Sequence, residues 1–148
     1  MRRLIFAGVA LAVGFVTTAA FAVDDPILTR KKLMQANGAV FYGVANGILK
    51  GEIPFNPVVA ASVLRTNSAV AYSFGDYFPE DSQEGDTRAS PKIWEEMEEF
   101  QQYLADFQAA ADAAIAADPQ TPEAFQTAME DIGQTCQQCH DEFRLADE

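Results

Sequence analysis

Metal- and redox-active side chains are scarce in this sequence: its 148 residues include two cysteines and one histidine. Two cysteines form at most one disulfide, which excludes a disulfide-dense scaffold. Together these residues supply three ligands, too few for a four-coordinate structural zinc site unless carboxylates complete it.

Basic residues are also scarce, with ten Lys and Arg against 22 Asp and Glu and a formal net charge of −12. A surface of this charge has no basic stripe to neutralise phosphates, which argues against nucleic acid and anionic membrane surfaces as partners. We expect protein partners with basic patches instead. Hydrophobic residues make up 49% of the chain, enough for one packed core and not for several domains.

Residues 1–22 have the pattern of a signal peptide. Arg2 and Arg3 form a short basic start, residues 4–16 are apolar apart from glycines, and Ala20 and Ala22 form a small-x-small cleavage site. We predict cleavage after Ala22, export to the periplasm and a single domain over residues 23–148. An uncleaved anchor is the alternative, because residues 4–22 are just long enough to span a bilayer. No other segment is long and apolar enough, so we expect no stable membrane insertion.

Four dipeptides pair a side chain that can cap a helix with a proline suited to the first helical position. They are Asp25-Pro26, Asn56-Pro57, Ser90-Pro91 and Thr121-Pro122. Each precedes apolar residues at three- and four-residue spacing, which predicts helices over 26–50, 57–74 and 91–117 and a fourth from 122. No window alternates with a two-residue period, so no strand is predicted. We expect an all-α fold, an antiparallel four-helix bundle whose longest connection is the polar segment 75–89.

Both cysteines and the only histidine lie together in Cys136-Gln137-Gln138-Cys139-His140. A Cys-x-x-Cys-His run is typical of covalent haem c attachment, in which the thiols add to the haem vinyl groups and the imidazole becomes an axial iron ligand. Three other interpretations are open: a zinc site completed by carboxylates, a thioredoxin-like redox pair, and a strained disulfide. We predict one haem c attached through Cys136 and Cys139, with His140 bound to its iron.

The place of this motif near the C-terminus, with Arg144 one turn after His140, resembles class II c-type cytochromes, the cytochrome c prime family. Further matches are spread along residues 23–148. They are the run from Arg30 to Met34, Asn37-Gly38, Lys50-Gly51, and the run from Pro91 to Trp94. The resemblance implies a four-helix bundle that holds one haem between its helices.

Members of this family differ from one another in the sixth ligand of the haem iron. The resemblance implies that His140 is the proximal ligand and that Met34, four residues after Arg30, stands where low-spin members have a ligating methionine. High-spin members have an apolar or aromatic residue near this place, leave the iron five-coordinate and bind nitric oxide or carbon monoxide. Met129 lies roughly 16 Å from His140 along the same predicted helix and cannot reach the opposite haem face. Met97 fits a core position.

Two arginines have alternative roles. The resemblance places Arg30 beside a haem propionate, although its Thr-Arg-Lys-Lys context also fits a solvated face. Arg144 either covers the proximal side of the haem or interacts with the dipole at the end of the last helix. Four aromatic residues are expected in the core around the haem: Phe41, Trp94, Phe100 and Phe125.

These features predict a periplasmic mono-haem electron carrier, six-coordinate and low-spin, with His140 and Met34 as axial ligands. The alternative is a five-coordinate haem that binds nitric oxide or carbon monoxide. We expect no enzymatic activity, because no second histidine can serve as a distal acid and base. The resemblance also allows a homodimer.

Overall fold

The computed structural model describes residues 25–146, and the predicted signal peptide at 1–22 lies outside them. The helical elements in chain order are α1 (Pro26–Gly38), the π-helix η1 (Ala39–Ala45), α2 (Asn46–Leu49), α3 (Pro57–Ser73), the 3-10 turns η2 (Phe74–Tyr77) and η3 (Glu80–Ser82), α4 (Lys92–Glu95), α5 (Met97–Ala116) and α6 (Pro122–Phe143). Residues 74–91, between α3 and α4, are called the connecting loop below.

The first rod of the fold consists of α1, η1 and α2 in unbroken succession. Asp25 Oδ1 accepts a hydrogen bond from the Leu28 amide at 2.8 Å, and Pro26 begins the helix. The rod ends before Gly51, whose φ of +74° is a left-handed conformation that costs glycine little. The predicted extent, 26–50, is thus confirmed. The prediction of a uniform α-helix is wrong, because residues 39–45 form wider π-helical turns.

The starts of α3 and α6 are also formed by a capping side chain followed by a proline. Asn56 Oδ1 accepts from the Val58 amide at 2.8 Å, and Thr121 Oγ1 accepts from the Ala124 amide at 3.2 Å. Each cap satisfies an amide that has no partner within its own helix. The predicted helix starts at Pro57 and Pro122 are therefore confirmed.

The prediction of one continuous helix over 91–117 is wrong at one residue. Glu96 has φ −126° and ψ 46°, which separates the short α4 from α5. The Trp94 indole Nε1 donates to the carbonyl oxygens of Phe78 at 3.1 Å and Pro79 at 3.2 Å. These bonds hold α4 against the connecting loop, and the break at Glu96 lets α5 follow the bundle.

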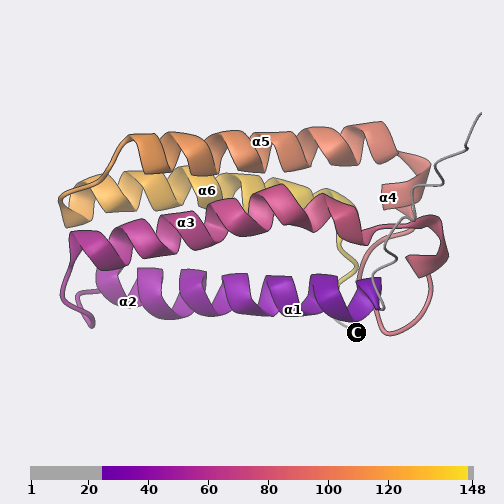
Figure 1. Ribbon diagram of the computed structural model, residues 1–148, viewed down its shortest axis with the longest axis horizontal. Coiled ribbons are helices and arrows are strands. Elements are labelled where there is room, and N and C mark those ends of the chain that lie inside the picture. The colour runs from indigo at the N-terminus through magenta and orange to yellow at the C-terminus, as the bar shows by residue number, and fades with distance from the viewer. Residues whose placement is uncertain (1–24, 147–148) are drawn as a thin grey trace, which may run out of the picture.

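The four rods lie side by side with alternating directions, which confirms the all-α, antiparallel four-helix bundle (Figure 1). α5 packs against both α3 and α6, and α3 packs against α1 and η1. The connecting loop covers the end of the bundle where α1 begins and α6 ends (Figure 1). An isolated antiparallel bridge joins Ala89 of this loop to Arg144. None of the helices within residues 25–146 is long and apolar enough to cross a membrane.

The core has two parts. A larger cluster runs along the bundle and includes Leu64, Phe125, Met129 and Ile132, with Phe41 packed against it. A smaller cluster fills the end near the connecting loop, and its members are Phe78, Ile93, Phe100, Leu104 and Phe143, with Trp94 packed against them. The four aromatic residues predicted in the core are thus all in it, Phe100 and Phe125 fully buried and Phe41 and Trp94 half-buried.

Candidate haem-binding site

The last two turns of α6 carry all three residues of the motif. Cys136 and Cys139 are free thiols, both half-buried. Cys136 packs against the larger core cluster and Cys139 against the smaller one. Because residues three apart lie on one helix face, both thiols are presented together at the junction of the two clusters.

The surroundings set the charge of these groups. Burial raises the pKa of the Cys136 thiol, and burial together with the neighbouring Cys136 raises the pKa of the Cys139 thiol to about 11. Burial lowers the pKa of His140, and the positive charges of Arg144 and Arg88 lower it further, against the opposite effect of Asp141. At neutral pH the thiols are therefore protonated and the imidazole is uncharged, so one of its ring nitrogens has a lone pair for a metal.

Met34 lies on α1, half-buried, and packs against the same cluster as Cys136. The first rod packs against α6 at α2, the end of the rod farther from Met34, whereas α1 packs against α3 and η2. α1, which carries Met34, and α6, which carries Cys136, therefore make their main contacts with other elements, and the first rod reaches α6 through α2.

A cavity of about 180 Å³ lies between the first rod and α6. It is lined by Phe41, Ala45, Asn46, Leu49, Met129, Glu130 and Gly133. Gly133 is three residues before Cys136, and a Cβ at this position would come within 3.3 Å of the Phe41 ring. The absent side chain lets the Phe41 ring lie close against the face of α6 that continues into the cysteine motif.

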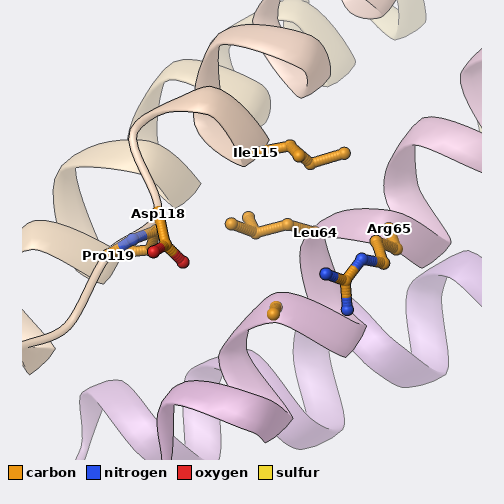
Figure 2. Close-up of a pocket in the computed structure, with 6 residues that line it drawn as sticks. Leu64, Arg65, Ile115, Asp118 and Pro119 are labelled. Carbon is orange, nitrogen blue, oxygen red and sulfur yellow. The ribbon is translucent and has the colours of Figure 1, made fainter.

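A second, much smaller cavity lies between the early turns of α3 and the turn that joins α5 to α6 (Figure 2). Leu64 and Ile115 point into it, and Arg65 and Asp118 lie at its edge (Figure 2). Its volume of about 20 Å³ holds about one water molecule. It lies beside the turn that precedes α6, about fourteen residues and therefore about 20 Å before Cys136 along the helix, so it is no part of the motif site.

Arg30 is buried, with 3% of its surface exposed, and its guanidinium faces the connecting loop. Nη1 donates to the Tyr77 carbonyl at 3.0 Å and to Ser82 Oγ at 2.9 Å. Nη2 donates to the Ser82 carbonyl and to Thr87 Oγ1, both at 2.8 Å. The predicted solvated face is thus wrong for Arg30, because the loop folds over it. Its predicted contact with a haem propionate stays a prediction.

Arg144 follows the last turn of α6 and is exposed, and its amide donates to the His140 carbonyl at 3.1 Å. The charge of its guanidinium acts on His140, as described above. Within residues 25–146, no three His, Cys, Asp or Glu side chains are grouped so that they could hold a metal ion.

Comparison with known proteins decides between the interpretations of the motif. The family model described as Cytochrome C' matches residues 25–144, the whole bundle. The chain belongs to the cytochrome c' family. This membership, with two cysteines near the C-terminus, identifies the cofactor of the cytochrome as one covalently bound haem c.

The relatives of this cytochrome include proteins named cytochrome c-556 and cytochrome c'. Cytochrome c-556 of Agrobacterium fabrum is 32% identical over 136 residues, which cover 92% of each chain. The structure of cytochrome c' from Rhodopseudomonas palustris superposes with a TM-score of 0.78 at 31% identity, over 85% of this chain and all of that one. The structure of oxidised cytochrome c556 from the same organism superposes with a TM-score of 0.75 at 29% identity, with the same coverage.

The residues of the site fit a covalently bound haem. Two free, protonated thiols lie together on one inward-facing stretch of α6, beside an uncharged imidazole and an apolar cavity. Haem c itself supplies the redox chemistry through its iron. The chain would hold it through Cys136, Cys139 and His140 and would exclude water with the aromatic residues of both clusters.

Sequence reasoning on this cytochrome missed the loop residues around the site. Ser82 and Thr87 lie 52 and 57 residues from Arg30, and neither belongs to a motif. Gly133, within the predicted fourth helix, was detectable in principle, because a glycine inside a helix has a conformational cost that calls for a packing reason.

Proposed function

We propose that this cytochrome is a periplasmic electron carrier whose single haem iron is bound by His140 and Met34. The observation that carries the proposal is the place of Met34, which packs from α1 against the apolar cluster that also receives Cys136 of α6. A thioether on a different helix from the imidazole can approach the iron from the face opposite His140. Ligation by His and Met fills both axial positions, so electron transfer needs little rearrangement of the iron.

The other two methionines of the bundle are accounted for by packing. Met129 is 2% exposed inside the larger cluster and lies on the same helix as His140. Met97 packs against the smaller cluster, where its sulfur accepts a long hydrogen bond of 3.7 Å from Gln101 Nε2. Met34 is therefore the methionine best placed for the iron.

A five-coordinate haem that binds nitric oxide or carbon monoxide is the second candidate. It is supported by the similarity to the cytochrome c' of Rhodopseudomonas palustris, which is as extensive as the similarity to cytochrome c556. Both candidates use the same attachment residues and differ in the role of Met34. Neither needs a distal acid and base, so we propose no enzymatic role for the protein.

The test is the visible spectrum of the purified holoprotein, oxidised and reduced, with and without carbon monoxide. For the electron carrier we expect sharp split bands on reduction, a weak far-red methionine-to-iron band in the ferric state, and no response to carbon monoxide. Met34→Ala should convert this spectrum to a high-spin, carbon monoxide-reactive one. Met97→Ala, a methionine in the smaller cluster, is the matched control and should leave the low-spin spectrum intact. A wild-type spectrum that is high-spin and shifts with carbon monoxide contradicts the carrier and favours the second candidate.

A further inference from the structure

Negative charge is concentrated at one end of the bundle. Residues 74–99, which form the connecting loop, α4 and the start of α5, contain nine of the 22 acidic residues of the chain and two basic ones. All nine are exposed. The turns at the other end of the bundle, 50–56 and 117–121, contain two acidic residues, Glu52 and Asp118 (Figure 1). Residues 74–99 are called the acidic end below.

The charge balance of the first two rods is the opposite. Residues 26–73, which include the first rod and α3, contain five basic residues and one acidic residue. A positively charged partner is therefore repelled from these rods and attracted to the acidic end. The uneven distribution gives the molecule a preferred direction of approach, which a net charge alone does not.

The acidic end lies against the last turn of α6, directly after the haem attachment motif. The Ser90 amide donates to the Phe143 carbonyl at 2.9 Å, and Lys92 forms an ion pair with Glu142. Phe143 is three residues after His140, which is less than one helical turn. A protein bound at the acidic end is thus close to the residues that hold the haem.

The backbone of the acidic end is held in place before any partner binds. The Trp94 indole donates to two carbonyls of the connecting loop, and Lys31 of α1 forms an ion pair with Asp86. The Leu145 amide donates to the Arg88 carbonyl at 2.9 Å. A surface that is already ordered loses little conformational freedom on binding, which favours rapid and reversible association.

Two exposed leucines flank the acidic end. Leu28, in the first turn of α1, is 50% exposed, and Leu145, after α6, is 47% exposed. Interfaces between proteins combine apolar contacts with a polar rim of complementary charge. A protein with a basic patch and apolar side chains suits both features, whereas a small cation suits the carboxylates alone. A second copy of the chain would bring like charges together at this end.

We propose that the acidic end, with Leu28 and Leu145, is the surface at which a basic redox protein docks to exchange electrons with the haem. This inference rests on the proposed function as an electron carrier. It adds the face of the bundle that the partner occupies and the reason for that choice, which is the coincidence of negative charge, exposed apolar side chains and the haem attachment residues at one end.

The first test maps the contact directly. The probe is mitochondrial cytochrome c, a basic redox protein, mixed with the holoprotein. A carbodiimide joins carboxylates to lysines that are in contact, and mass spectrometry of the digested product identifies the linked peptides. We expect the linked carboxylates to lie within residues 76–99. Because this test uses the wild-type chain, it does not depend on the folding of any variant.

The second test compares two matched pairs of substitutions by stopped-flow electron transfer to the ferric probe. Glu80→Gln with Glu84→Gln removes two charges from the acidic end. Glu52→Gln with Glu123→Gln is the control, because it changes the net charge equally and all four side chains are exposed. Glu123 lies about 30 Å from Phe143 along α6, about three Debye lengths at 0.1 M ionic strength.

At this ionic strength we expect electron transfer to slow about threefold in the first pair and to stay near the wild-type rate in the control pair. Neither pair should change the rate with an uncharged small-molecule oxidant, because the haem site itself is untouched.

The failures of the two proposals are distinguishable. Equal slowing in both pairs would show that net charge alone guides the encounter, and it would overturn the docking surface. Cross-links to carboxylates outside residues 76–99, or between two copies of this chain at the acidic end, would overturn it as well. A wild-type spectrum without the methionine-to-iron band overturns the proposed function, and with it the role of this surface in electron exchange. A spectrum with the band, together with any of the other results, overturns the docking surface alone.

Discussion

Cys139 has a pKa raised from 9.0 to about 11, mainly because burial disfavours the thiolate. Since the thiolate is the reactive form, we expect the folded haem-free chain to alkylate slowly at Cys139. At pH 8 the shift lowers the thiolate population by about a hundredfold relative to an unshifted thiol. Iodoacetamide labelling followed by peptide mass spectrometry measures the rate. The urea-unfolded chain is the control, and equal rates in both states would contradict the prediction.

The same shift makes the stability of the haem-free chain depend on pH. The unfolded thiol ionises near its ordinary pKa of 9.0, whereas the folded thiol keeps its proton up to about 11. The folded state therefore binds more protons in this window, and the free energy of unfolding should fall as the pH rises from 9 to 11. Urea unfolding at several pH values measures the slope. Cys139→Ala should flatten it, and an unchanged slope in that variant would assign it to other groups.

Some residues in and around the site could be predicted from the sequence, and others could not. Cys136, Cys139 and His140 were predictable together because haem attachment requires them to be adjacent in sequence. The surroundings of Arg30 were not, because they depend on how a loop more than 50 residues away folds over α1. A polar loop residue such as Thr87 has no periodicity that would indicate a buried partner.

At the scale of elements, the helix starts depend on caps whose strength can be measured. Asn56 Oδ1 accepts from the Val58 amide at 2.8 Å and more weakly from the Val59 amide at 3.3 Å. We expect Asn56→Ala to destabilise the holoprotein by about 1 kcal/mol, because the first amides of α3 lose their acceptor. Thermal unfolding followed by circular dichroism measures the loss. Asn56→Asp keeps an acceptor oxygen and should stay near the wild type, and equal losses in both variants would show that the cap is not the cause.

Helix positions followed from local chemistry, whereas interruptions within helices did not. Asp25, Asn56 and Thr121 cap their helices as their sequence context predicts. The π-helical turns at 39–45 and the break at Glu96 have no such local signal. The break at Glu96 accompanies a long-range contact, because Trp94, two residues before it, donates hydrogen bonds to the connecting loop.

At the scale of the whole molecule, the net charge of −12 predicts electrostatic attraction to partners with basic patches. We expect association with a basic redox protein to slow by at least about tenfold when ionic strength rises from about 10 to about 150 mM, because salt screens the attraction. Stopped-flow oxidation of the ferrous protein measures the rate. An uncharged small-molecule oxidant is the control and should show little dependence on salt. A similar lack of dependence with the basic protein would contradict electrostatic steering.

The connecting loop joins the beginning of the first helix to the end of the last, and Met34 and His140 lie on these two helices. If Met34 and His140 bind one iron, as proposed, the site unites regions separated by most of the described chain, and such a long-range contact is costly in loop-closure entropy. During synthesis, a nascent chain has every other part of the bundle before it has the haem attachment residues. A chain that stops short of the end of α6 therefore lacks Cys136, Cys139 and His140 together and cannot hold the haem covalently.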